Sequence, residues 1–167
     1  TVYKVVAYSE ERGATVQRDF SNSSQKRQTK NTIFSSVLEG GTSTGIDCDD
    51  ETVFDYALKI PAITEEELTN TTIIVIINLD VYAGTTFLYL DGRSIALCPM
   101  GSSNFEEIVY HEAGGHGFGK LLDEYIYYTN QSYPATSSQE LNQFRQGNVW
   151  SFGANLSVTN DQESVHW

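Results

Sequence analysis

Two histidines and a glutamate lie in a glycine-rich stretch at residues 110–125, and their spacing constrains the fold more than any other feature of the chain. The stretch reads Tyr-His-Glu-Ala-Gly-Gly-His-Gly-Phe-Gly-Lys-Leu-Leu-Asp-Glu-Tyr. Neutral imidazole is a common zinc ligand, and a His-Glu pair followed one helical turn later by a second His is typical of a catalytic zinc site. We therefore predict that His111 and His116 bind one zinc ion, with Glu112 beside them.

The interval between the two histidines is one residue longer than in the usual motif. Side chains at i and i+4 lie about 40° apart around an ideal helix, whereas those at i and i+5 lie about 140° apart. A regular helix therefore cannot direct both His111 and His116 at one metal ion. We predict a local widening to the π form, which often occurs at functional sites. Gly114 and Gly115 lie in this turn, and paired glycines there favour a bulge or a close backbone approach over a stable α-helix.

The motif resembles those of two groups of metallopeptidases. The run His111-Glu112-Ala113-Gly114-Gly115-His116 is similar to the lengthened His-Glu-x-x-Gly-His motif of dipeptidyl-peptidase III enzymes, in which both histidines bind zinc. The longer run, which continues through Gly119 into Leu122-Asp123-Glu124-Tyr125, resembles the IgA-protease-like metallopeptidase family more closely, although that family usually has His-Glu-x-x-His. Weaker likeness occurs at residues 8–13, at residues 54–57 and in the apolar run that ends near Asn78. We take the second family as the match.

This resemblance implies an α+β fold of the zincin type, in which a mixed, twisted sheet supports an active-site helix. It implies one catalytic Zn²⁺, bound by His111 and His116. A carboxylate beside the metal can accept a proton from the attacking water and pass it to the leaving amine. The resemblance gives that general-base role to Glu112.

The third metal ligand is less strongly defined by the sequence. The family resemblance favours Asp123, with Glu124 as the next choice. In a straight helix Asp123 would lie about 10 Å beyond His116 along the axis, so the chain has to turn back. Gly117 and Gly119 provide places for that turn, because glycine tolerates positive φ at a helix C-terminus.

Three further groups are alternatives at the site. Glu140, in a helix predicted at residues 137–145, would supply the third ligand if a later helix contributes it. His166 is the remaining histidine, and a lone histidine near a chain end is more often a solvated side chain. One of the tyrosines at 125, 127 and 128 could donate a hydrogen bond to a developing oxyanion.

The pattern of apolar residues predicts the elements around this helix. Ser103 and Glu106 form a capping-box pattern that starts the active helix near residue 103. Strands are predicted at 2–8, 72–79, 86–90 and 94–98, with Asp91-Gly92 as a hairpin turn, and helices at 50–60 and 64–68. By analogy with zinc peptidases of this build, residues 94–100 would form the edge strand that binds an extended substrate.

Composition limits the functional classes. A net charge of −12 opposes binding to nucleic-acid phosphates, and no apolar run is long enough for membrane insertion. The length of 167 residues suits a single catalytic domain, and the absence of a closing element before Trp167 suggests a fragment of a longer protein. Cys48 and Cys98 can form one disulfide or remain free thiols. A secreted, cell-surface or periplasmic location is implied only by the family resemblance.

Together these patterns favour a zinc-dependent endopeptidase that hydrolyses proteins or glycoproteins. The alternative from another class is a non-catalytic, zinc-containing module that binds glycoproteins, in which the inserted residue moves Glu112 out of line. An exopeptidase of the dipeptidyl-peptidase III type is disfavoured, because those enzymes are much larger, two-lobed proteins. The sequence does not encode the identity of the cleaved bond.

Overall fold

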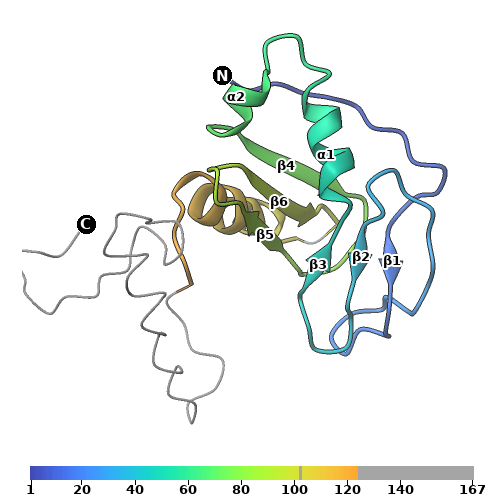
Figure 1. The fold of residues 1–167 in the computed structure, drawn as a ribbon. Coiled ribbons are helices and arrows are strands. Elements are labelled where there is room, and N and C mark those ends of the chain that lie inside the picture. The colour runs from blue at the N-terminus through green and yellow to red at the C-terminus, as the bar shows by residue number, and fades with distance from the viewer. Residues whose placement is uncertain (102, 124–167) are drawn as a thin grey trace, which may run out of the picture.

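The structure is a computed structural model that describes residues 1–101 and 103–123. These residues form a mixed α+β fold with two three-stranded sheets and a few short helices (Figure 1). The predicted α+β class is therefore confirmed. None of the helices in this part of the chain has the length and apolar character needed to cross a bilayer.

The second sheet supports the candidate site. It consists of β4 (Thr72–Ile77), β6 (Ser94–Pro99) and β5 (Thr85–Leu88), in that order. β6 pairs in parallel with β4 and antiparallel with β5, so the sheet is mixed. The predicted strand at 72–79 and the hairpin around Asp91-Gly92 are confirmed, and Gly92 takes the positive φ of 96° that the turn requires.

The prediction that residues 94–100 form a sheet edge is wrong. β6 is the central strand, and all six of its residues are buried. Ile95 and Leu97 belong to the main core with α1, whereas Ala96 and Cys98 pack against Ile108 and Ala113 of the active helix. A strand covered on both faces reads as a continuous apolar run, so its position within the sheet is not visible in the sequence. The edges are β4 and β5.

The N-terminal half forms a smaller sheet and two helices. β1 (Thr15–Val16), β2 (Val37–Leu38) and β3 (Ile46–Asp47) pair in that order. The predicted helices at 50–60 and 64–68 are confirmed as α1 (Asp50–Ala57) and α2 (Glu65–Leu68). Asp49 caps α1 through Thr52 N–H, and Thr64 forms a complete capping box with Glu67.

Residues 2–8 do not form the predicted strand. They are irregular and largely exposed, and the side chain of Val2 is 96% accessible. Their β-branched and aromatic residues have strand propensity, but propensity reflects packing on a neighbouring strand more than an intrinsic backbone preference. In the described part of the chain, β1 begins only at Thr15.

The active helix begins later than its sequence pattern suggests. α3 (Phe105–Val109) has Asn104 as its N-cap and no side-chain cap hydrogen bond, so the predicted capping box from Ser103 is not present. The Ser103 hydroxyl donates to Asn104 Oδ1, and the Asn104 amide donates to Glu107 Oε2 at 2.6 Å. These side chains bond to one another in place of the backbone. α3 then continues into the π-helix η1 (Tyr110–Phe118).

A close backbone contact fixes η1 on the sheet. A Cβ built on Gly117 would lie 2.5 Å from Thr72 Cγ2, so only glycine fits where the helix crosses β4. The buried Ser94 hydroxyl lies 3.2 Å from both the Gly117 carbonyl oxygen and Thr72 Oγ1. Gly114 and Gly115 make no such contact, so the predicted close approach occurs later in the helix than expected.

We expect Gly117→Ala to destabilise the protein and Gly114→Ala not to do so. An alanine at 117 would meet Thr72, whereas a Cβ at Gly114 would have no neighbour within 4 Å. Crowding of this kind lowers the free energy of unfolding by about 1–3 kcal/mol, which urea denaturation can measure. Combining Gly117→Ala with Thr72→Ser removes the crowding methyl group and should restore most of the loss. Equal effects of the two single alanine substitutions would contradict this account.

Candidate metal centre

The π-helix brings the two histidines of the motif onto the same side of the helix. η1 spans nine residues, and its i→i+5 hydrogen bonding compensates for the residue inserted between His111 and His116. The imidazole rings meet edge to face, with centroids 4.7 Å apart and planes nearly perpendicular. The prediction of a π widening at this position is therefore confirmed.

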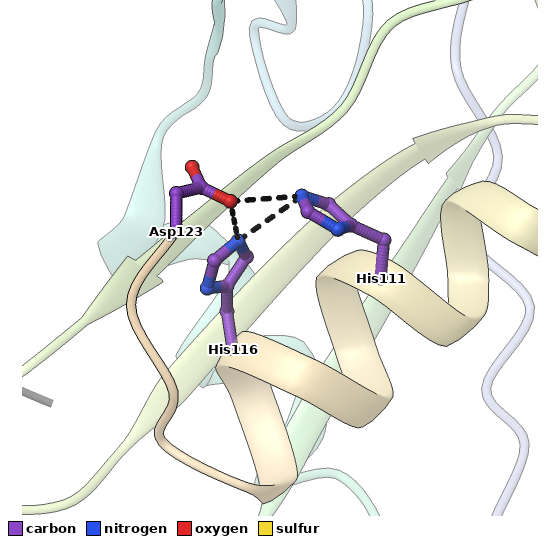
Figure 2. Close-up of side chains that lie close together, drawn as sticks. All are labelled: His111, His116 and Asp123. Atoms are coloured by element: carbon purple, nitrogen blue, oxygen red, sulfur yellow. Dashed lines mark hydrogen bonds and ion pairs between the residues drawn. The ribbon is translucent and has the colours of Figure 1, made fainter. Parts of the chain in front are cut away.

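Three side-chain atoms converge beside η1 (Figure 2). His111 Nε2 and His116 Nε2 are 3.2 Å apart, and each lies 3.3 Å from Asp123 Oδ1. Tetrahedral zinc with bond lengths of about 2.0–2.2 Å places neighbouring ligand atoms about 3.3–3.6 Å apart, so the observed distances lie at the short end of this range. The triangle thus has the edge length of a tetrahedral metal site with one position left over. It is the one group of this kind among the residues that the structure describes.

The chain turns back after the helix to bring Asp123 to the histidines. Gly119 ends η1 with a φ of −74°, and the positive φ of 54° occurs at Lys120. The predicted use of Gly117 and Gly119 for a left-handed turn is therefore wrong. Gly117 lies inside the helix, where it is needed for the contact with Thr72.

The turn also determines which ring nitrogen of His116 carries a proton. His116 Nδ1 lies 2.6 Å from the carbonyl oxygen of Leu121. A carbonyl only accepts hydrogen bonds, so Nδ1 carries a proton, and the neutral form of the ring is the tautomer whose Nε2 lone pair points into the triangle. Metal-binding histidines typically have such an outer partner. An imidazole lone pair and a carboxylate oxygen directed at a common point favour a bound cation.

Glu112 lies beside the triangle but is not part of it. Its side chain is 7% exposed, and Oε2 accepts a hydrogen bond of 2.7 Å from the Thr86 hydroxyl of β5. Gly84 makes room for it, because a Cβ there would come within 2.5 Å of Glu112 Oε1. The carboxylate is thus held against the edge strand β5, in the same cleft as the two histidines and Asp123.

A cleft of about 850 Å³ opens over these residues. The helix contributes Glu107, the two histidines and Glu112 to its lining, and Asp123 also lines it. Other lining residues come from the loop before β3, from the segment leading into β5 and from β5 itself, including Thr42, Gly84 and Thr86. His111 is 47% exposed, so the donor triangle is accessible from the cleft.

Sequence reasoning did not identify Thr86, Gly84 or the Leu121 carbonyl as parts of the site. Threonine in an apolar strand is ordinary, and a glycine before a strand is usually assigned to a turn. Their roles depend on β5 lying beside η1, which is a tertiary contact. Other predicted candidates, namely Glu124, Glu140, His166 and Tyr125, Tyr127 and Tyr128, lie outside the described residues.

Both cysteines are free thiols, so the predicted option of a disulfide is not adopted. Burial raises the pKa of each thiol to about 12, with further contributions from Asp47 at Cys48 and from Glu112 at Cys98. Cys98 lies on the face of β6 beneath the active helix. Neither thiol is suited to nucleophilic or redox chemistry near neutral pH, because the thiolate is the reactive species.

We expect both thiols to react very slowly with iodoacetamide in the folded protein. At pH 8 a pKa of about 12 leaves roughly 10⁻⁴ of a thiol ionised, against about a quarter for an ordinary cysteine, so alkylation should be about 10³-fold slower than in the unfolded chain. Mass spectrometry with and without denaturant gives the two rates. Raising the pH should accelerate the native reaction about tenfold per unit, and rapid native labelling of Cys98 at pH 8 would contradict its burial.

Comparison of the chain with protein-family models, with curated proteins and with solved structures found no match.

Proposed function

We propose that this protein is a zinc metallopeptidase that cleaves internal peptide bonds of proteins or glycoproteins. One observation carries the proposal: two imidazole nitrogens and a carboxylate oxygen converge at tetrahedral spacing in an open cleft, next to a buried glutamate. Catalytic zinc sites combine three protein ligands with an open position for water or substrate. The resemblance of residues 110–125 to the IgA-protease-like metallopeptidases supports the same chemistry.

The donor set suits zinc better than other common metals. Two histidines and one carboxylate match the nitrogen and oxygen ligands of catalytic zinc, whereas calcium and magnesium prefer all-oxygen sites with six or more ligands. His111, His116 and Asp123 would hold the ion. When bound, zinc supplies Lewis-acid chemistry, polarising a substrate carbonyl and allowing water to be deprotonated near neutral pH.

The residues around this centre would perform the proton transfers and the positioning. Glu112 would accept a proton from the attacking water at its carboxylate and pass it to the amine of the leaving fragment. The Thr86 hydroxyl holds that carboxylate in one orientation, which reduces the reorganisation needed at each transfer. The Leu121 carbonyl keeps His116 in the tautomer that leaves Nε2 available.

We extend the proposal to a zincin-like fold in which β5 contacts the substrate. β5 is the edge strand next to the active helix, and Thr85, Thr86 and Leu88 line the cleft. An extended peptide can add to a sheet edge through backbone hydrogen bonds. This role replaces the one that the sequence suggested for residues 94–100. An exported location remains part of the proposal, on the family resemblance alone.

One observation favours a second candidate, a non-catalytic zinc-containing module that binds glycoproteins. The Glu112 carboxylate is largely buried and already accepts a hydrogen bond from Thr86, which would restrict its access to water. In such a module the metal would stabilise the turn at residues 119–123 and the cleft would bind a partner without cleaving it. The two candidates differ in the consequence of replacing Glu112.

We expect the purified protein to bind about one zinc ion per chain at neutral pH. His116→Ala should abolish stoichiometric binding, because it removes one donor of the triangle, whereas Glu112→Gln should retain the metal. Elemental analysis after dialysis measures both. His166→Ala is the matched control, since His166 is outside the motif. The assigned ligand set would be contradicted if His166→Ala lost zinc and Asp123→Ala retained it.

Glu112→Gln should lower kcat for peptide hydrolysis by about 10²–10⁴-fold without loss of zinc, because glutamine cannot accept the proton. Mass spectrometry of products from a mixed peptide library gives both the rate and the cleavage positions. Glu106→Gln, on the same helix but outside the cleft, should leave turnover unchanged. Internal fragments would support an endopeptidase and released N-terminal dipeptides an exopeptidase. A zinc-loaded protein that binds but never cleaves would favour the binding module.

A further inference from the structure

Lys120 has a backbone conformation that its residue type does not favour. Its φ is 54°, in the left-handed region that non-glycine residues rarely occupy, while the neighbouring Gly119 is right-handed with a φ of −74°. Among the described residues only Ser35 shares this feature without being glycine. A strained non-glycine residue persists only where the surrounding structure fixes its conformation, and such positions cluster at functional sites.

The side chain of Lys120 is anchored to the β5–β6 hairpin. Its Nζ donates a hydrogen bond of 2.9 Å to the carbonyl oxygen of Gly92, the residue that takes positive φ in the hairpin turn. Lys120 is half-buried, and this burial lowers the pKa of its ammonium. A glycine at position 120 would relieve the backbone but could not make this contact.

The anchored residue lies at the centre of the turn that closes the metal site. Its N–H donates to the His116 carbonyl at 3.1 Å, and the next N–H, of Leu121, donates to Gly115. Leu121 then presents its carbonyl to His116 Nδ1, and Asp123 reaches both histidines two residues later. The conformation at position 120 therefore affects two groups of the site: the Leu121 carbonyl, which contacts His116, and Asp123, the third donor.

We propose that Lys120 is a positioning residue for the metal centre, whose bond to the Gly92 carbonyl holds the turn so that Leu121 and Asp123 meet the histidines. This inference depends on the proposed metal site. It also links the ligand turn to the hairpin whose β5 strand lines the cleft. Residues that support ligands from outside the coordination sphere typically change metal affinity by about 10–100-fold when replaced.

Two substitutions separate the anchor from the backbone strain. Lys120→Met keeps the strain and removes the ammonium, whereas Lys120→Gly removes both. If the anchor positions the site, both variants should bind Zn²⁺ about tenfold or more weakly in competition with a chromophoric chelator. If position 120 only has to accommodate a turn, Lys120→Gly should bind zinc as well as the parent or better, which would overturn the proposal. Lys120→Arg retains a long cationic donor and should recover part of the affinity.

A matched control excludes an effect of net charge. Removing a lysine makes the protein more negative and should strengthen the attraction of a cation, so weaker binding in Lys120→Met cannot arise from charge alone. Lys59→Met removes a lysine that contacts only Tyr56 among the interactions identified for it, and it should leave zinc affinity unchanged. The unfolding transition of each metal-free variant shows whether the fold is retained.

A double-mutant cycle tests whether Lys120 acts through Asp123. In an Asp123→Ala background zinc binding is already weakened, and Lys120→Gly should lower the remaining affinity by a smaller factor than in the parent, because only the contact of Leu121 with His116 is left for it to disturb. Additive losses would overturn the positioning role.

The visible spectrum of bound Co²⁺, which reports coordination geometry, should differ between the parent and Lys120→Gly. A parent protein that binds no metal would refute the proposed site itself, a result distinct from equal affinities of parent and variants.

Discussion

The extra residue between His111 and His116 is the constraint on which the site depends. In an α-helix this spacing would turn the two rings to different faces, so no common metal position would exist. The π-helical hydrogen bonding of η1 restores a shared direction and leaves Nε2 atoms 3.2 Å apart. A π segment is less favourable than an α-helix and is usually found where function requires it. The extra residue between the histidines therefore accounts for both the π-helical geometry and the position of the two Nε2 atoms.

Packing against the sheet holds this unusual helix in place. The strand beneath it presents the small side chains Ala96 and Cys98, and Gly117 lies against Thr72 with no room for a Cβ. The same packing brings the Thr86 hydroxyl to Glu112. Because the helix contacts all three strands of the sheet, Glu112, the two histidines and the lining of the cleft share one support.

Local patterns predicted local structure well, and errors arose where distant segments meet. The hairpin at Asp91-Gly92 and the Asp50–Ala57 helix follow from turn chemistry and capping, which act over a few residues. The strand order of the sheet was not predictable, because a central strand and a buried edge strand have similar sequences. Residues 2–8 have strand propensity but no neighbouring strand among the described residues. Ser103 and Glu106 match a capping box, yet nearby side chains compete for the same hydrogen bonds.

The sequence by itself determined the chemical identity of the centre: a His-Glu pair, a second histidine at i+5, glycines that permit a widened helix, and an aspartate seven residues further on. These are properties of residue type and spacing. Only the tertiary structure decided how the aspartate returns to the histidines, which residue takes positive φ, and which strand borders the cleft. Each of these depends on contacts between residues far apart in the chain, such as Lys120 with Gly92 and Glu112 with Thr86. Spacing along the chain carries no information about such contacts.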